Sequence, residues 1–141
     1  MDKEVLLMKL LYVAGTIHRE HNSREKNQPR LSPMAENTLR LLLKEGRMNQ
    51  RAIAKKMEVS GQAISELMKK LEEKDYIKRQ SGEFNNENII NLTIYGEERA
   101  KEAEKTMIEL AQKVFVEFSE DEKEDLFFLL EKVENKLGKE R

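Results

Sequence analysis

The sequence predicts a mainly α-helical protein with one small β-hairpin, and three observations lead to that fold class. Apolar residues recur at helical spacing along most of the 141 residues. The composition contains few helix breakers, with two prolines and six glycines. Residues 76–80 and 89–92 depart from the helical period and form two strand-like runs around a turn-rich segment. A chain of this length fits one domain or one subunit of an oligomer.

Two helices are expected before residue 47. The first covers residues 3–21, where leucines, Ala14 and Ile17 lie on one face, and a polar connector follows it to residue 30. Ser32 starts the second helix because its hydroxyl can cap free amide groups, and proline at the next position is tolerated in a first helical turn. Gly46 is expected to end this helix.

Capping side chains mark the starts of the remaining helices. Asn49 and Ser60 begin a short third helix and a fourth one, with a tight connection between them. Thr93 begins a long helix that runs to about Phe118, and Ser119 opens the last helix with a capping box. The residues expected to face inward in the third and fourth helices are Ile53, Ala54, Met57, Ile64, Leu67, Met68 and Leu71.

The net charge of −1 conceals a segregation of charge along the chain. Residues 44–79 carry ten basic and six acidic side chains, whereas residues 93–141 carry nine basic and fourteen acidic ones. A basic middle beside an acidic C-terminal third is typical of a surface that binds a polyanion locally. A solvated helical surface is the alternative explanation.

The order helix, short helix, turn, helix and hairpin within this basic stretch predicts a helix-turn-helix followed by a wing, over residues 31–96. The second helix of such a unit can lie in the major groove of DNA while the first braces it. The candidates on this recognition helix are Ser60, Gly61, Gln62, Ser65, Glu66 and Lys69. The candidates for phosphate and other DNA contacts are Asn49, Gln50, Arg51, Lys55, Lys56, Lys70, Lys78 and Arg79.

Three segments resemble motifs of the MarR (multiple antibiotic resistance regulator) family. Residues 48–60 read MNQRAIAKKMEVS and are similar to the family's T-Q-x-x-L-A-x-x-L-x-V-S run. Residues 67–79 read LMKKLEEKDYIKR and are similar to L-V-x-R-L-E-x-x-G-L-V-x-R, and residues 91–96 resemble the L-T-x-x-G opening of the long helix after the wing. The resemblance covers nearly the whole chain and implies a winged-helix transcription factor that acts as a homodimer on a palindromic site.

The sequence departs from the family pattern at three places. Glu66 stands where members often carry Arg, and it could accept from a cytosine amino group or repel phosphates. Asp75 stands at the usual glycine, which Asp tolerates at positive φ. The wing tip offers no cation where the family has an arginine for the minor groove, although amides there could still donate hydrogen bonds. The wing candidates are Asn85, Asn86 and Asn88.

The terminal segments, residues 1–30 and 97–141, are expected to be dimerisation helices. Their apolar residues exceed what one thin layer of helix would cover, so intertwined helices of two chains would bury them; a monomer with a thicker helical core is the alternative. The apolar residues of the C-terminal part are Val114, Phe115, Phe118, Leu126, Phe127, Phe128, Leu130 and Val133.

Weaker signals concern ligands and metals. Several family members bind small aromatic anions between the dimer helices and the helix-turn-helix, which implies such an effector here. The residues that this resemblance suggests for the cleft are Tyr12, His18, Met34 and Arg40. His18 and His21 lie on one helix face and could hold a metal with Glu20, but an exposed polar helix end is the preferred interpretation, so neither a metal nor a cofactor is expected.

The function expected from these features is a sequence-specific regulator of transcription, with repression favoured over activation. Cysteine is absent, which excludes thiol chemistry, and no catalytic motif stands out, so an enzyme is not expected. The N-terminal residues make a poor signal peptide, and the protein is expected in the cytoplasm. The alternative function is a winged-helix dimer that serves as a protein-interaction module with little or no specific DNA binding.

Overall fold

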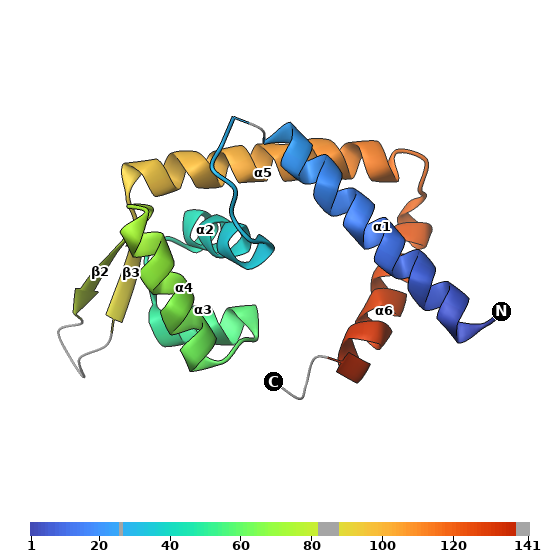
Figure 1. Ribbon diagram of the computed structural model, residues 1–141, viewed down its shortest axis with the longest axis horizontal. Helices are drawn as coiled ribbons and strands as arrows, with labels where there is room; N and C mark the ends of the chain where they lie inside the picture. Colours follow the sequence, from blue (N-terminus) through green and yellow to red (C-terminus); the bar gives the residue numbers. More distant parts are fainter. Residues whose placement is uncertain (26, 82–87, 138–141) are drawn as a thin grey trace.

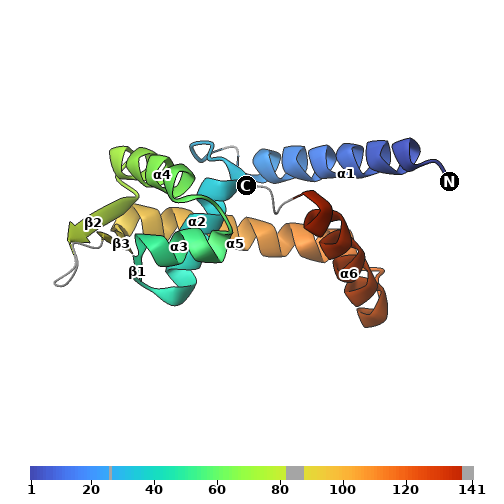
Figure 2. The same ribbon diagram turned by 90° about the horizontal axis from the view of Figure 1, so that it is seen from below.

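The computed structural model describes residues 1–25, 27–81 and 88–137, and it confirms a mainly helical fold with a small hairpin. Figure 1 shows the helix-turn-helix and the hairpin at one end of the molecule and α6 with the start of α1 at the other, an arrangement that Figure 2 repeats from below. The elements are α1 (Lys3–Arg24), α2 (Pro33–Glu45), β1 (Met48–Asn49), α3 (Gln50–Met57), α4 (Gly61–Glu73), β2 (Ile77–Ser81), β3 (Asn88–Leu92), α5 (Ile94–Phe115) and α6 (Glu120–Leu137).

The capping residues expected from the sequence start their helices. The side-chain oxygens of Ser32, Asn49, Ser60 and Thr93 each accept a hydrogen bond from a backbone amide two or three residues later. Ser119 forms the reciprocal capping box, in which its hydroxyl accepts from the amide of residue 122 at 3.1 Å and its own amide donates to the carboxylate there at 3.0 Å. Local polar chemistry therefore sets five of the helix starts.

The apolar core lies in the helix-turn-helix half of the chain. Helices α2, α3 and α4 pack with the sheet and with the first turns of α5, and the four apolar residues of α4 are all buried as expected. A helix of thirteen residues with one apolar stripe is stabilised mainly by this packing. The largest fully buried side chains are Leu39, Ile53, Ile64, Met68, Leu71, Ile77 and Ile90.

The sheet has three antiparallel strands in the order β1-β3-β2, one more than the sequence predicts. The hairpin pairs Ile77 with Leu92, and the two-residue strand β1 adds to the other edge of β3 by pairing Met48 with Ile90. Two residues are too few to show the alternation of a strand, which explains why β1 leaves no sign in the sequence.

The base of the hairpin is tied to the start of α5. The hydroxyl of Thr93 donates to the carbonyl of Asp75 at 2.6 Å, and its amide donates to the carbonyl of Tyr76 at 3.1 Å. A Cβ placed on Gly96 would lie only 1.9 Å from the Tyr76 carbonyl oxygen, so no other residue fits there without a shift. Asp75 has a φ of 63°, which confirms the expected positive value.

Two helix ends differ from expectation. Helix α1 extends through Arg24, one turn beyond residue 21, because His21 and the residue after the helix are held by buried partners described below. Helix α5 ends at Phe115 rather than near Phe118, since the amide of Phe118 donates to the Phe115 carbonyl in a turn. The two rings then meet edge to face at 5.2 Å between centroids.

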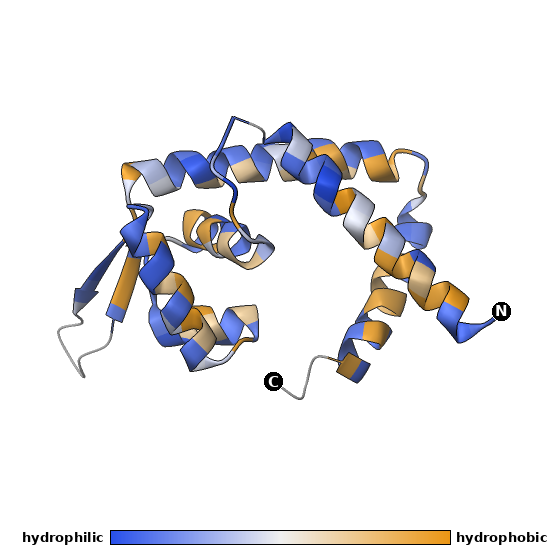
Figure 3. Ribbon diagram, in the orientation of Figure 1, coloured by the Kyte–Doolittle hydropathy of each residue, from blue (hydrophilic) through white to orange (hydrophobic). Residues whose placement is uncertain are grey.

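The other half of the chain leaves apolar side chains uncovered. Figure 3 shows orange hydrophobic segments along α1 and α6, although none of the residues of α6 is buried. The side chains of Leu6 and Phe127, for example, are 59% and 65% exposed. No described helix is long and apolar enough to span a membrane.

Candidate nucleic-acid interface

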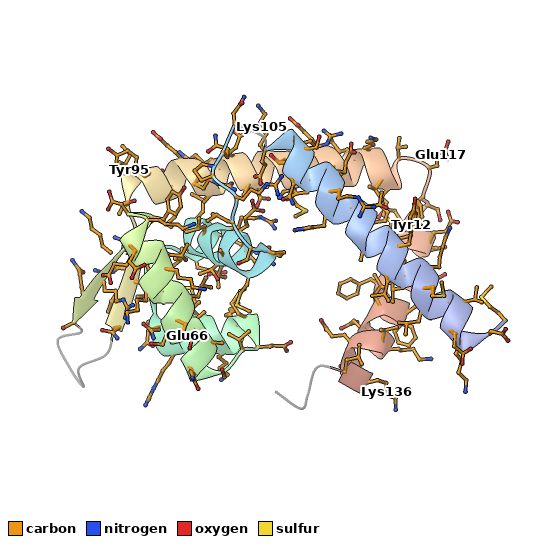
Figure 4. All side chains as sticks on the ribbon, in the orientation of Figure 1. Tyr12, Glu66, Tyr95, Lys105, Glu117 and Lys136 are labelled. Atoms are coloured by element: carbon orange, nitrogen blue, oxygen red, sulfur yellow. The ribbon has the colours of Figure 1, made fainter. Side chains whose placement is uncertain are left out.

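Helix α4 has a buried face and an exposed polar face. Ile64 and Leu71 are among the residues that pack inward, whereas Gln62, Ser65 and Glu66 are exposed together with the lysines that follow. Glu66 is labelled in Figure 4. Because these polar positions recur at i, i+3 and i+4, they form one outward stripe along the helix. The recognition-helix candidates Ser60, Gly61, Gln62, Ser65, Glu66 and Lys69 are therefore all on the exposed side.

The N-terminus of α4 is accessible to an approaching phosphate group. Ser60 occupies the cap position, and no atom lies within 4 Å of a Cβ built on Gly61. Free amide groups and the partial positive charge of a helix N-terminus favour an approaching phosphate. The first helix of the unit, α3, contacts α4 and buries Ile53 and Ala54, so it can act as a brace.

The residues predicted to contact phosphates lie around this stripe, and they differ in exposure and in the partners that they already have. Lysines 55, 56, 70 and 78 and Arg51 are exposed, so their charges are available to a polyanion. Arg79 is half-buried, and its Nε lies 3.4 Å from a carboxylate oxygen of Glu72, which partly neutralises it. Asn49 is occupied as the cap of α3, and Gln50 is half-buried.

Only one of the three wing candidates belongs to the described part of the chain. Asn88 begins β3, is exposed and pairs with Ser81 of β2. Asn85 and Asn86 lie outside the described residues. Asn88 thus lies at the end of the hairpin next to residues 82–87, opposite the end that is tied to α5.

A buried ionic cluster of His21, Glu25, Glu36 and Arg99 lies behind the helix-turn-helix, and it joins α1, α2 and α5. The Arg99 guanidinium donates to both oxygens of Glu25, at 3.0 and 3.3 Å, and to Glu36 at 2.8 Å. The Nε2 of His21 lies 2.6 Å from the other oxygen of Glu36 and 3.2 Å from Glu25. A further bond from Arg99 to the carbonyl of Pro29, at 3.3 Å, holds the connector.

The surroundings of the two carboxyls in the buried ionic cluster shift their pKa values in opposite directions. Burial raises the pKa of Glu25, and a hydrogen bond shared with Glu36 raises it further. Burial also acts to raise the pKa of Glu36, but hydrogen bonds from Glu25, His21 and Arg99 outweigh it and hold the pKa below its usual range. Burial acts to lower the pKa of Arg99, but the hydrogen bonds to both carboxylates outweigh that cost, so the pKa is raised.

His21, Glu25 and Glu36 bring ligand-type atoms within 4.8 Å of one another. Arg99 already spans both carboxylates, so these atoms serve an internal ion-pair network. Glu20, which the sequence offers as a metal ligand beside His18, pairs with Lys113 at 2.8 Å.

The expectation of an exposed helix end at His21 is wrong, because only 7% of this residue is exposed. His18, one turn earlier, remains exposed, with its Nε2 lying 3.3 Å from the side-chain amide of Asn22.

The four residues suggested for a ligand cleft are not gathered at one place. His18 lines a cavity of about 170 Å³ between α1 and α2, with Ile17, His21 and Glu36 among the other lining residues. Arg40 instead lines a separate cavity, and its Nε pairs with Glu104 of α5 at 2.6 Å. Met34 packs against the core, and Tyr12 is exposed on α1.

The buried ionic cluster leaves one signal in the sequence, at Arg99, which motifs and spacing alone did not single out. Arg99 falls on the inward face of α5, in phase with Gly96, Ala100 and Ala103, all of which are buried. An arginine among small inward residues requires acidic partners, because an unpaired buried charge is very costly. Those partners, at positions 25 and 36, could not be selected from the other acidic residues by spacing alone.

The comparisons with known proteins agree with this geometry. A family model described as winged helix-turn-helix DNA-binding matches residues 34–78. No curated protein sequence matches the chain significantly.

Among solved structures, a MepR-like protein complexed with pseudoligands is 26% identical, with a TM-score of 0.74 over 96% of this chain and 93% of that chain. The MepR–DNA complex of S. aureus is 22% identical, with a TM-score of 0.77 over 97% and 99% of the two chains. The protein NMB1585, a MarR family regulator from Neisseria meningitidis, is 22% identical, with a TM-score of 0.70 over 96% and 93%. Residues 34–78 therefore match a winged helix-turn-helix DNA-binding family, and the chain shares the fold of solved structures that include a MarR family regulator.

Proposed function

We propose that this protein is a sequence-specific regulator of transcription that binds a palindromic operator as a homodimer and represses nearby genes. The observation that carries the proposal is the outward polar stripe of α4, which the core and α3 hold in place and which exposed lysines and Arg51 surround. The likeness to the S. aureus MepR–DNA complex supports it at the level of the fold.

In this function α4 enters the major groove from its open N-terminus. Gln62, on the first turn, is suited to an adenine, since its amide can donate to N7 and accept from N6. Lys69, about two turns later, is suited to a phosphate and contributes affinity without sequence preference. The hairpin around Asn88 lies along the neighbouring minor groove.

The dimer is proposed from the uncovered apolar faces of residues 1–30 and 97–141, with residues 31–96 as the DNA-binding region. A single chain leaves α6 without a buried residue, and it also leaves large side chains on α1 exposed, such as Leu11 at 65%. Contiguous apolar surface of this kind marks an interface. A second copy of the chain covers it and places two recognition helices about one helical turn of DNA apart.

Sedimentation of two variants tests the dimer. Phe127→Glu places a charge on the uncovered face of α6 and is expected to shift the protein toward monomer. Lys105→Glu, at an exposed position on α5 that Figure 4 shows away from α6, is the control and should leave the mass unchanged. A monomeric wild-type protein at micromolar concentration would contradict the proposal.

An effector is proposed for the cavity between α1 and α2. The described lining residues include the carboxylate of Glu36 and no lysine or arginine, which favours a neutral molecule over the aromatic anion that the family resemblance implies. A molecule that binds one spacing of the recognition helices more tightly would change DNA affinity by shifting the population. The MepR-like relative was solved with pseudoligands.

Two alanine variants test the division of roles on α4. Selection from a library of random duplexes first defines the preferred site. Gln62→Ala should then change the base preference at one position of each half-site. Lys69→Ala should weaken binding to all sequences alike and lower the slope of log affinity against log salt concentration by about one unit. An equal loss on every sequence for both variants would contradict this division, and unselective binding by the wild type would favour a protein-interaction module instead.

A further inference from the structure

The exposed stripe of α4 contains one acidic side chain, Glu66, between Gln62 and Lys69. A carboxylate that faces a polyanion is repelled by phosphates unless a donor on the DNA compensates it. Its place on the stripe brings it as close to the groove as its neighbours, because residues 62 and 66 lie on the same helix face, four positions apart. Any groove that α4 enters must therefore accommodate this charge.

The Glu66 carboxylate is not used inside the protein. Lys69 and Lys70 follow it at the spacings that give ion pairs on a helix, yet neither pairs with it in the part of the chain that the structure describes. Elsewhere such pairs do form, as between Glu97 and Lys101 at 3.1 Å. The carboxylate thus remains available to an external donor.

The chemistry of the major groove narrows that donor to one base. A carboxylate only accepts hydrogen bonds, and the exocyclic amines of cytosine and adenine are the only donors displayed in the groove. Adenine places its N7 acceptor beside the amine, where it opposes the second carboxylate oxygen. Cytosine presents its N4 amine without an acceptor on the same base.

We infer that Glu66 is a specificity-determining residue, whose carboxylate accepts a hydrogen bond from the N4 amine of one cytosine in each half-site. The inference rests on the proposed function. Four helical residues advance about 6 Å along the axis, and successive base pairs are about 3.4 Å apart. The cytosine is therefore expected about two base-pair steps from the base that Gln62 contacts.

The test compares the duplexes selected by the wild type, Glu66→Ala, Glu66→Gln and Glu117→Ala. Glu117 is exposed between α5 and α6, which Figure 4 shows at the other end of the molecule from α4, so its variant makes the same change in charge away from the stripe. The wild type and Glu117→Ala should enrich one motif, and Glu66→Ala should lose the cytosine at a single position of each half-site. Glu66→Gln should prefer adenine there, because an amide can both donate to N7 and accept from N6.

Titration of the selected duplex supplies the magnitude. Exchanging that C·G pair for T·A should lower the affinity of the wild type for the duplex by about 5- to 150-fold. The same exchange should change the affinity of Glu66→Ala by no more than about twofold. An unchanged motif in Glu66→Ala, beside selective binding by the wild type, would overturn this inference alone. Absence of any enriched motif with the wild type would remove the proposed function as well.

Discussion

Replacing Arg99 by methionine removes the guanidinium that spans both carboxylates of the buried ionic cluster. The guanidinium is 2% exposed and holds Glu25 and Glu36 at 2.8 to 3.3 Å. Leaving buried charges without their partner costs about 3–5 kcal/mol. With an unfolding entropy of about 0.3 kcal/mol/K for a chain of this length, the melting temperature should fall by roughly 10–17 °C.

The assay is thermal unfolding followed by circular dichroism at one fixed protein concentration, since the proposed dimerisation would make the melting temperature depend on concentration. The control is Arg79→Met, which removes a half-exposed guanidinium from a 3.4 Å pair with Glu72. A pair of that kind is worth under about 1 kcal/mol, so the control should lose no more than roughly 3 °C.

The stability lost in Arg99→Met should depend on pH. This dependence distinguishes an effect of the lost charge from an effect of lost packing. Without the guanidinium, which acts to lower it, the folded-state pKa of Glu25 is raised further above the unfolded value by burial and by Glu36. Stability is then retained at low pH, where the folded state holds the protons, and is lost as pH rises through the raised pKa. The deficit should therefore be larger at pH 8 than at pH 5.5. A deficit equal to that of the control, or one independent of pH, would show that the buried charges do not carry this stability.

Three further substitutions test local features of the fold. Gly96→Ala places a Cβ 1.9 Å from the Tyr76 carbonyl oxygen, and should cost about 1–3 kcal/mol in urea unfolding; an unchanged midpoint would contradict that close approach. Ser60→Ala removes the cap of α4 and should cost about 0.5–2 kcal/mol, which the same titration measures. Glu36→Gln should abolish this group's contribution to the loss of stability in acid. The pKa of Glu36 is lowered in the folded protein, so its contribution to stability is present above the ordinary pKa of about 4.5 and is lost as the pH falls through the folded-state pKa. Parallel acid titrations of the two proteins would argue against that assignment.

The sequence was sufficient where short-range chemistry decides the structure. Ser32 and Ser60 cap their helices because a hydroxyl three residues before an amide needs no tertiary partner to form that bond. The inward face of α4 also follows from its period alone, since Ile64 and Leu71 lie on the same side of any regular helix. These local rules place the helix-turn-helix and its outward stripe.

The sequence was insufficient where the partners are remote. Arg99 meets Glu25 and Glu36, which lie 74 and 63 positions earlier in the chain, and no spacing rule connects residues so far apart. The pairing of Met48 with Ile90 has the same cause, because a strand of two residues exists only through its neighbour. The interior position of His21 follows from these contacts, which explains why an exposed helix end was the wrong expectation.

Operator recognition is tested most directly by the ratio of affinities for the selected palindromic duplex and for a scrambled duplex of equal length, at two salt concentrations. A sequence-specific dimer should bind the palindrome at least about 10³-fold more tightly at physiological salt, with both affinities falling steeply as salt rises. A ratio near one at both concentrations would contradict sequence-specific recognition, because phosphate contacts alone would then explain the binding.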